Sequence, residues 1–361
     1  MNLRSRIAAT TLGVLVVGFT SSSIASPLYQ VLDLGTLGGS QSQANGINNT
    51  GQIVGWATAL PQAGSTQYPF LWDGTMHGFT AEGQGQAINA NAQIVGRHVT
   101  NKPPSGSLLA FSSSLGGINQ DLSPLQNEFS SQANGINDSG TVVGESFSAP
   151  VFGTVSAVSW NGGGSPTFLT PGAAWAVNNS GTIVGESDSP SGFLPGAYPF
   201  VWDGSLHIIG TQKGTAYGIN KAGDVVGALY ENSDGLNHAF LDHVGVVTDL
   251  GPGVALSINS AGDIVGQVAA SATIAFNGAL AYEWINGAAI DLNSLIPADS
   301  GWSLSGATGI NDKGQIVGWG ASPTLSRETH GFLLTPVPLP IAAWLFGSAL
   351  GALRLARRRN S

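Results

Sequence analysis

A nine-residue phrase, Ile/Val-Asn-x-x-Gly-x-Ile/Val-Val-Gly, recurs along the whole chain and restricts its fold more than any other feature. Successive copies begin between 39 and 52 residues apart. Repetition at this period indicates one supersecondary unit used many times, with neighbouring units covering each other's apolar faces. The seven copies are Ile47–Gly55, Ile88–Gly96, Ile136–Gly144, Val177–Gly185, Ile219–Gly227, Ile258–Gly266 and Ile310–Gly318.

Each copy predicts a β-hairpin. The Asn side chain can accept a hydrogen bond from the backbone two residues on, and Gly tolerates the positive φ that closes a short hairpin loop. In the second copy Ala92 replaces Gly, so we expect Asn91 to take the left-handed position. An asparagine ladder with a function of its own is the alternative. The predicted structural turn residues are Asn48, Gly51, Asn137, Gly140, Asn178, Gly181, Asn220, Gly223, Asn259, Gly262, Asn311 and Gly314.

The strand before each turn carries small residues at two positions. One residue before the Ile/Val stands Gly, Ala or Ser, and three before it stands Ala or Gly, as in Gly46 and Ala44. Positions two apart share one face of a strand, so this face should let another sheet approach closely, as where blades converge on an axis. The residue between them varies freely: Asn45, Gln86, Asn134, Trp175, Tyr217, Leu256 and Thr308.

After the turn, a β-branched run, an aromatic third strand such as Pro69–Trp72 and a fourth strand often ending Asp-Leu complete the repeat. Four short strands in about 44 residues match a propeller blade. The seventh copy lacks a fourth strand, whereas Tyr29–Gly35 precedes the first copy and ends Asp-Leu-Gly. Pairing the two would remove both open edges. We therefore predict an all-β, closed seven-bladed β-propeller over residues 26–336, with a β-solenoid as the alternative.

The repeats resemble the bacterial extracellular HAF-repeat family, which is named for a His-Ala-Phe tripeptide. His238-Ala239-Phe240 matches it, and His77-Gly78-Phe79 and His330-Gly331-Phe332 are close versions. Asp33–Gly39 (Asp-Leu-Gly-Thr-Leu-Gly-Gly) is also typical of the family. The resemblance covers roughly residues 29–334. It implies an exported repeat protein and brings no catalytic residues.

The first 25 residues predict a secretory signal peptide. Arg4 and Arg6 precede an apolar stretch, Leu12–Phe19, and Ser23-Ile24-Ala25 supplies the small residues read by signal peptidase. Cleavage is expected after Ala25. The alternative is a retained membrane anchor, although the apolar stretch is short for a span.

Residues 337–361 resemble a PEP-CTERM sorting signal of the Val-Pro-Leu-Pro variant. Val337, Pro338, Leu339 and Pro340 are followed by apolar Ile341–Leu353 and by Arg354, Arg357, Arg358 and Arg359. The apolar part is short for a span of about 20 residues, but arginines that snorkel to the interface make a transmembrane helix workable. The resemblance implies cleavage by an exosortase and transient anchoring in the inner membrane of a Gram-negative-type bacterium. An ordinary tail anchor is the alternative.

Composition agrees with export and argues against nucleic-acid binding. Charged residues make up 9% of the chain, against about 25% in average soluble proteins. The chain has no Cys, so blade packing alone must stabilise it. Six of the 12 basic residues lie in the end segments and all 21 acids lie between them, which leaves the domain at 6 − 21 = −15. A domain this acidic has no basic stripe for a phosphate backbone.

The sequence contains no recognisable catalytic motif. The recurrence of His77, His238 and His330 favours a structural hydrogen bond. The strands expected to line the channel offer no acid, base or histidine. Glu231, Asp234 and Asn237 form the loop richest in oxygen atoms, and Ca²⁺ is the only cofactor it leaves open, beside a solvated acidic turn.

We therefore expect a non-enzymatic, exosortase-sorted structural or binding module, extracellular or at the cell surface. Its partners would be signal peptidase and exosortase during export, and extracellular polysaccharide or other surface proteins afterwards. The alternative is a carbohydrate-active enzyme, a glycosidase or lyase, with catalytic residues on variable loops.

Overall fold

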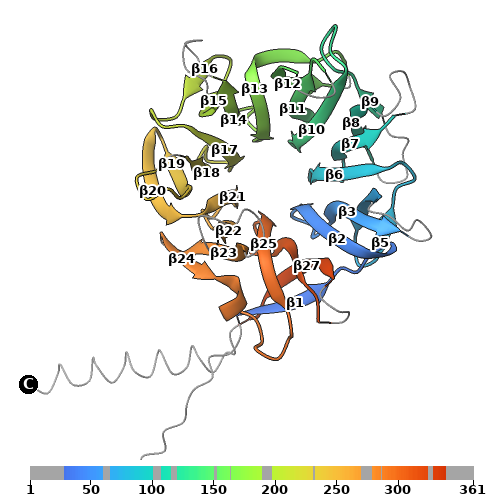
Figure 1. The fold of residues 1–361 in the computed structure, drawn as a ribbon, viewed down its shortest axis with the longest axis vertical. Helices are drawn as coiled ribbons and strands as arrows, with labels where there is room; N and C mark the ends of the chain where they lie inside the picture. Colours follow the sequence, from blue (N-terminus) through green and yellow to red (C-terminus); the bar gives the residue numbers. More distant parts are fainter. Residues whose placement is uncertain are drawn as a thin grey trace, which may run out of the picture.

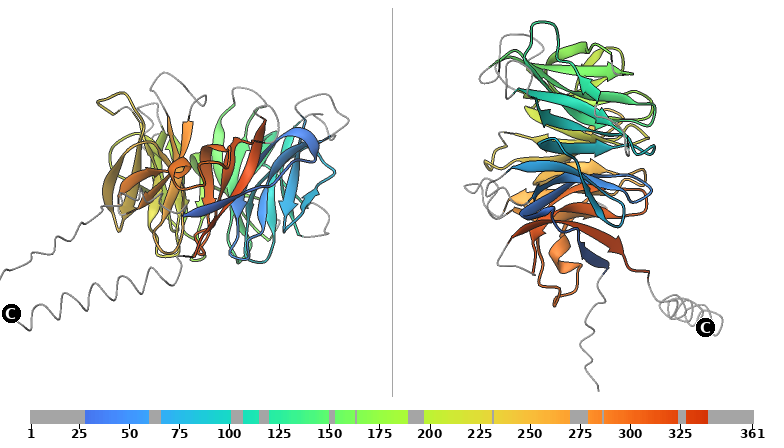
Figure 2. Two further views of the ribbon diagram at one scale, coloured as in Figure 1. Left: turned by 90° about the horizontal axis from the view of Figure 1, so that it is seen from below. Right: turned by 90° about the vertical axis from the view of Figure 1, so that its right-hand side faces the viewer.

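The chain forms a ring of seven β-sheets, the blades, around a central channel (Figure 1). Views from the side show a flat disc (Figure 2). The predicted all-β closed seven-bladed propeller is confirmed. The computed structural model describes residues 28–59, 66–100, 107–114, 120–149, 153–162, 164–188, 197–230, 232–269, 279–285, 287–323 and 328–338.

Every blade is an antiparallel sheet of four strands. The groups below are blades 1 to 7 in that order, and the strands of each group run from the channel outward. The groups are β2 (Gly38–Ile47), β3 (Ile53–Ala59), β4 (Gln67–Trp72), β5 (Met76–Gly78); β6 (Gly83–Ile88), β7 (Ile94–Val99), β8 (Leu108–Ser113), β9 (Gln120–Leu122); β10 (Ser130–Ile136), β11 (Thr141–Phe147), β12 (Val155–Asn161), first half of β13 (Thr167–Val177); second half of β13, β14 (Ile183–Asp188), β15 (Ala197–Trp202), β16 (Leu206–Ile208); β17 (Gly214–Ile219), β18 (Val225–Leu229), β19 (His238–His243), β20 (Val246–Pro252); β21 (Val254–Ile258), β22 (Ile264–Ala269), β23 (Ala279–Ile285), β24 (Ala288–Asp291); and β25 (Ser303–Ile310), β26 (Ile316–Ala321), β27 (Thr329–Pro336), β1 (Tyr29–Asp33).

Two short features connect these sheets. Strand β13 is continuous, pairing first with β12 as the outer strand of blade 3 and then with β14 as the inner strand of blade 4. A 3₁₀-helix, η1 (Leu292–Ser294), follows β24.

The β-branched pair after each turn explains how neighbouring blades hold together. Successive residues of a strand point to opposite faces. Ile53 therefore packs into the core between blades 7 and 1, while Val54 packs into the core between blades 1 and 2. The other six copies divide their pairs in the same way, which gives seven apolar clusters, one for each interface between blades.

The small residues of the inner strands allow these strands to approach one another around the axis. A Cβ added to Gly135 would lie 2.9 Å from the backbone oxygen of Trp175 in the next blade. The last Gly of the phrase has different neighbours, since a Cβ at Gly227 would lie 2.0 Å from the backbone oxygen of Thr215 in its own blade and 2.7 Å from Cε1 of Phe240, its partner on the third strand. The glycines thus make room for inner strands on one side and for buried aromatic rings on the other.

The strand at the amino-terminal side closes the ring. β1 pairs antiparallel with β27 over five residues, from Tyr29 with Pro336 to Asp33 with Phe332. The Tyr29 hydroxyl also donates to both carboxylate oxygens of Glu283 in blade 6, at 3.3 and 3.2 Å. The core between blades 7 and 1 contains Leu34 and Leu333 beside Ala44 and Phe70. The interface that closes the ring is therefore packed like the other six.

Candidate functional site

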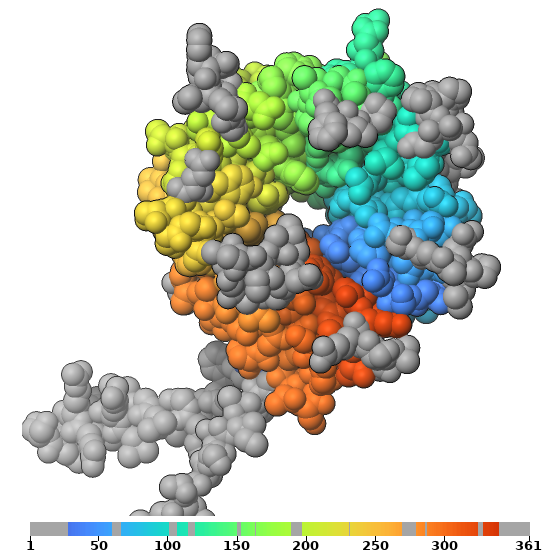
Figure 3. All heavy atoms as spheres, in the orientation of Figure 1, coloured from blue at the N-terminus to red at the C-terminus, as the bar shows by residue number. Residues whose placement is uncertain are grey.

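The channel is the concave feature shared by all seven blades, and it stays open along the axis when all atoms are drawn (Figure 3). The inner strands line it, as predicted. A cavity of about 470 Å³ lies at the end formed by the hairpin turns, which we name the turn end. A second cavity of about 210 Å³ lies further along, toward the opposite end, which we name the variable end. Both cavities are bounded by a collar of seven β-branched residues: Ile47, Ile88, Ile136, Val177, Ile219, Ile258 and Ile310.

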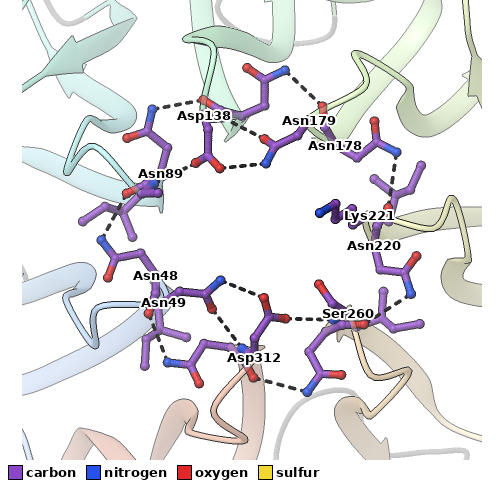
Figure 4. Close-up of a pocket in the computed structure, with 18 of the residues that line it drawn as sticks. Asn48, Asn49, Asn89, Asp138, Asn178, Asn179, Asn220, Lys221, Ser260 and Asp312 are labelled. Atoms are coloured by element: carbon purple, nitrogen blue, oxygen red, sulfur yellow. Dashed lines mark hydrogen bonds between the residues drawn. The ribbon is translucent and has the colours of Figure 1, made fainter.

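Seven asparagines form a closed ring of hydrogen bonds at the turn end (Figure 4). The Nδ2 of Asn48 donates to the backbone oxygen of Asn89 in the next blade at 3.1 Å. The last bond, from Asn311 to the backbone oxygen of Asn48 at 3.0 Å, completes the circle. The five bonds between them have lengths of 3.0 to 3.2 Å and start from Asn89, Asn137, Asn178, Asn220 and Asn259.

The same asparagines also shape their own turns. The Oδ1 of Asn178 accepts hydrogen bonds from the backbone N–H groups of Ser180 and Thr182, both at 3.0 Å. The Asn side chain therefore bonds within its turn through oxygen and to the next blade through nitrogen. These side chains are buried and paired, so we assign them to blade alignment.

The six turn glycines take the left-handed conformation, with φ between 70° and 93°. In the second copy the expectation for Asn91 is wrong, because Ala92 itself adopts φ 58°. The N–H of Ala92 donates to the oxygen of Asn89 at 3.1 Å, as the turn glycines do in their copies. The hydrogen bonds of the hairpin therefore impose a positive φ at this position, although alanine disfavours a positive φ.

The residues that follow the turn asparagines bring charged groups to the rim of the turn end. Asp138 and Asn179 bond reciprocally, and so do Asp312 and Asn49. Burial works against ionisation of Asp312, but bonds from Ser260 and Asn49 lower the pKa of its carboxyl. Lys221 points into the opening (Figure 4).

The variable end has a different composition in each blade. Its cavity is lined by the residues that vary freely between the two small positions, which we name the wall positions. Asn45, Gln86 and Asn134 place amides on blades 1 to 3, whereas Trp175 and Tyr217 place aromatic rings on blades 4 and 5, with ring centroids 5.6 Å apart. The remaining wall positions are Leu256 and Thr308.

The residue directly after each phrase forms a second set beside the wall positions. Each pairs with the inner strand two residues before the wall position, as Arg97 does with Gln84 and Glu145 with Gln132. The full set is Trp56, Arg97, Glu145, Glu186, Ala228, Gln267 and Trp319.

A network of hydrogen bonds connects the two sets. Arg97 donates to Gln132 at 2.8 Å and to Gln84 at 3.0 Å, and Gln132 donates to Asn134 at 2.8 Å. Asn134 in turn donates to Glu145 at 2.8 Å. On the aromatic side, the hydroxyls of Tyr217 and Tyr230 lie 3.1 Å apart, Tyr230 donates to Thr215 at 2.8 Å, and Thr215 bonds to Glu186.

Two carboxyl groups in this network hold their protons more tightly than usual. Burial raises the pKa of Glu145, and the nearby Glu186 adds to the rise, against the opposing bond from Asn134. Burial also raises the pKa of Glu186, against its bond from Thr215. The variable end therefore combines amides, aromatic rings, a guanidinium and two carboxyls that protonate readily.

Sequence reasoning missed Arg97, Glu145 and Glu186 because it examined only the inner strands. The inner strands do supply a channel wall without acids, bases or histidines. The charged side chains Arg97, Glu145 and Glu186 belong to the second strands of their blades. The signal was present in the sequence, since the residue after the phrase varies from copy to copy, with only Trp and Glu used twice.

All six histidines lie beside aspartates. His238 contacts Asp249 at 2.8 Å and Asp234 at 2.9 Å, and His330 contacts Asp33 at 2.9 Å. These two histidines lie at the start of third strands, and each contacts the Asp of an Asp-Leu-Gly in the fourth strand. The other pairs are His77–Asp73, His98–Asp121, His207–Asp203 and His243–Asp224.

The grouping of His77 with His238 and His330 is wrong. His77 lies in β5, a fourth strand, and its Nε2 contacts Asp73 and Thr75 at 3.0 Å each. His207 repeats this arrangement in β16 with Asp203 and Ser205. His77-Gly78-Phe79 resembles the tripeptide in sequence only, because His77 occupies the same position in its blade as His207.

The predicted Ca²⁺ candidates are not assembled as a ligand set among the described residues. The carboxylate of Asp234 accepts from the Leu236 N–H and contacts His238, and the backbone oxygen of Asn237 accepts from Gly253. Glu231 lies outside the described residues. No group of three or more His, Asp or Glu suited to a metal occurs in the part of the chain that the structure describes.

Most of the predicted processing residues lie beyond the described ranges, namely Ala25, Leu339, Pro340, Arg357, Arg358 and Arg359. Val337 and Pro338 are described and follow the end of β27 at Pro336. The N–H of Val337 donates to the oxygen of Leu28 at 2.8 Å, so the two ends of the domain lie side by side. None of the described helices is long and apolar enough to cross a membrane.

Comparison with known proteins identifies the fold alone. No protein-family model matches the chain, and no curated protein does. The β-propeller domain of the Trilobed protease from Pyrococcus furiosus, described as having an open velcro topology, aligns with a TM-score of 0.51 at 10% identity. The alignment covers 81% of this chain and 93% of that one.

Two further solved structures align more loosely. One is a protein of unknown function from Dyadobacter fermentans, with a TM-score of 0.38 at 13% identity, covering 85% of this chain and 98% of its own. The other is a protein provisionally assigned as a gluconolactonase, with a TM-score of 0.36 at 10% identity, covering 85% and 92%.

Proposed function

We propose that this chain is an exported, non-enzymatic binding module that acts at the cell surface or in the extracellular matrix. Its binding face is the variable end of the channel. The observation that carries this proposal is the contrast between the two ends. The turn end repeats one bonded asparagine in all seven blades, whereas the variable end presents wall residues that change from blade to blade around an open cavity.

The position of the variable end supports the same assignment. The second strand of each blade runs away from its turn and stops at this end, as β3 does at Ala59 and β7 at Val99. The connections between second and third strands therefore start here, and so do those from each fourth strand to the next first strand, which range from none within the continuous β13 to residues 292–302 between β24 and β25. Binding residues concentrate on variable loops held by a rigid scaffold.

The proposed sorting at residues 337–361 fits the way the domain ends. Cleavage after Ala25 and near Pro338 would leave β1 and β27 complete, because β1 begins at Tyr29 and β27 ends at Pro336. Mass spectrometry of the protein recovered outside the cells tests this processing. We expect a carboxyl terminus near Pro338, and a peptide that reads through Leu339 into Trp344 would refute exosortase sorting.

A glycan array tests the binding function. The purified protein should bind at least one neutral polysaccharide or oligosaccharide, and changing Trp56 and Gln84 to Ala should remove most of that signal. Changing Asn179 and Lys221 to Ala at the turn end should leave it unchanged. Absence of binding to every glycan, or equal loss from both pairs of variants, would contradict the proposal.

A carbohydrate-active enzyme is the second candidate, and the raised pKa values of Glu145 and Glu186 favour it. A glycosidase needs one protonated and one ionised carboxyl across the scissile bond. Release of reducing sugars from a bound glycan, lost in Glu145→Gln and Glu186→Gln, would establish this function. Full binding without sugar release would favour the module.

A further inference from the structure

A second set of hydrogen bonds joins neighbouring blades at the turn end, and this set is incomplete. It involves the residues that directly follow the turn asparagines, which we name the rim positions. In four blades the rim N–H donates to a side-chain oxygen of Asp or Asn at the rim position of the next blade, at 2.8 to 2.9 Å. All seven rim positions line the cavity of about 470 Å³, and they are Asn49, Ala90, Asp138, Asn179, Lys221, Ser260 and Asp312.

The other three rim N–H groups have no acceptor within the described ranges. They belong to Asn49, Asn179 and Lys221. In the blade that follows each of them, Ala90 and Lys221 carry no side-chain oxygen, and Ser260 has a shorter side chain than Asp or Asn. These residues are exposed. The three N–H groups therefore face space that side-chain oxygens occupy in the other blades.

Lys221 brings a positive charge to the part of the rim where two of these N–H groups lie. Its side chain points into the opening (Figure 4). Every ion pair among the described residues involves histidine, so no carboxylate there lies within ion-pair distance of the Lys221 ammonium. The ammonium helps to lower the pKa of the Asp312 carboxyl, but the two groups do not meet. Free N–H groups beside a cation are the donors that bind anions.

We infer that the turn end binds the carboxylate of an acidic side chain from a partner protein, in the sector of the rim from Asn179 to Ser260. The carboxylate accepts from a free rim N–H and pairs with the Lys221 ammonium. This site is separate from the binding face proposed at the variable end, and neither depends on the other.

Aspartates of this chain already bind the rim in the same way. The carboxylate of Asp138 accepts from the Ala90 N–H at 2.8 Å and from Asn179 Nδ2 at 2.7 Å. Asp312, in blade 7, makes the corresponding contacts with the rim positions of blades 6 and 1. A carboxylate in the open sector finds the same pair of donors, with the Lys221 ammonium in place of the amide nitrogen.

The rim favours a single carboxylate on a short stem. The open sector has one cation, and Asp138 and Asp312 lie on the same rim, so a dianion such as sulfate is repelled more strongly than a carboxylate. The carboxylates that already occupy rim positions reach the N–H groups on one methylene group. A sugar acid carries its carboxylate directly on the ring, which brings the bulk of the sugar against the rim side chains. An acidic peptide is therefore the better ligand.

Fluorescence polarisation with labelled peptides tests the inference on the purified protein. The probe is a short Gly/Ser peptide with two aspartates and blocked ends, and its matched control carries two asparagines instead. We expect the aspartate peptide to bind and the asparagine peptide not to bind, with affinity that falls as salt rises. The domain is itself strongly acidic, so an acidic peptide gains nothing from nonspecific attraction.

Variants at the rim locate the site. Lys221→Ala should weaken binding about tenfold, the effect of one charge-assisted hydrogen bond, and Lys221→Arg should retain most of it. Ser260→Asn offers an amide oxygen to the Lys221 N–H, as Asn179 does to the N–H of Asp138, and should weaken binding without changing the charge. Ala90→Asn is the matched control, since it fills the gap in blade 2 and should leave binding unchanged. Thermal melting shows whether each variant is folded.

Several results would overturn the inference. Absence of binding, equal binding of the two peptides, or unchanged binding in Lys221→Ala would remove the site. Binding of sulfate or of a polyuronate in place of the aspartate peptide would overturn the ligand class. Neutral glycan binding, measured on the same variants, reports the proposed function of the variable end separately and should be unchanged in all of them.

Discussion

The turn end and the variable end of the channel are built by the same seven hairpins but use them differently. At the turn end each blade repeats Asn, and each Asn bonds to its own turn and to the next blade. At the variable end the wall positions range from Asn45 to Trp175 and Leu256. Side chains that contact the next blade in every repeat are constrained by the ring, whereas side chains that face the cavity are free to differ.

The comparison also separates two kinds of polar group. Asparagine has no charge to lose, so the ring at the turn end does not titrate. The variable end contains titratable groups near the channel, such as Glu145, and at the periphery, such as His330 and Asp33. Changes in pH should therefore leave the asparagine ring itself unaffected and act on the variable end and on rim carboxyls such as Asp312.

The largest effect should follow removal of one ring asparagine. Asn178→Ala deletes the bond to Asn220 and leaves the N–H groups of Ser180 and Thr182 without their acceptor. We expect a loss of about 2–4 kcal/mol in the free energy of unfolding. Denaturant titration measures it. Asn179→Ala is the matched control, since Asn179 is exposed and should cost less than about 1 kcal/mol.

A β-branched residue at a turn glycine should produce the next largest effect. Gly140 has φ 84°, so Gly140→Val should lower the free energy of unfolding by about 1–3 kcal/mol through backbone strain. A Cβ added to Gly140 would lie 3.6 Å from Oε1 of Gln93, an ordinary contact distance, so steric overlap contributes little. A loss below about 0.5 kcal/mol in urea denaturation would contradict the strain argument.

A smaller, pH-dependent effect is expected where β1 meets β27. The bond to Asp33 raises the pKa of His330 above 6.5, although burial opposes it. Burial opposes ionisation of Asp33, but bonds from His330, Gly35 and Ser322 lower its pKa below 3.8. The His330 contribution is complete below pH 6.5 and is lost as pH rises through its folded pKa. The Asp33 contribution is complete above pH 3.8 and is lost as pH falls through its folded pKa.

This pair should therefore stabilise the ring most between about pH 4 and 6.5. Melting temperatures of the protein and of His330→Gln, measured from about pH 3 to 9, give the contribution of the pair as their difference. We expect the difference to be largest inside that window and to shrink on both sides. A difference that is constant with pH would show that His330 acts by packing alone.

The smallest expected effect is a gain in stability. Ala92 has φ 58°, where glycine is less strained, so Ala92→Gly should change the free energy of unfolding by about 0 to 1 kcal/mol in the stabilising direction. Gly140→Ala, the reverse change in the next copy, should be destabilising. If both substitutions raised the free energy of unfolding, or both lowered it, the two turns would differ in more than their residue type.

Sequence reasoning predicted the fold because the phrase encodes a complete local structure. Period, turn chemistry and small residues each follow from contacts that every blade repeats, and the orphan Asp33-Leu34-Gly35 revealed the closing strand. His330 contacts Asp33 as His238 contacts Asp249, so the family tripeptide and the Asp-Leu-Gly belong to one contact.

The site was harder to predict because its residues do not repeat. Glu145 lies beside Gln132 and Asn134 in its own blade, but Arg97 reaches Gln132 from the second strand of the neighbouring blade, so this contact depends on how the two blades pack. The ring of asparagine bonds was also missed. Each residue was identified as a turn former, but its bond to the next blade depends on the rotation between blades, which no local pattern contains.

The central claim is that the turn end maintains the ring and the variable end binds a glycan. Glycan affinity and melting temperature, measured together for Trp56→Ala and Asn178→Ala, test it most directly. The account predicts that Trp56→Ala loses most of its binding while its melting temperature changes little, and that Asn178→Ala melts at a clearly lower temperature while it still binds below that temperature. The reverse assignment, with binding lost only in Asn178→Ala at temperatures where it remains folded, would contradict the claim.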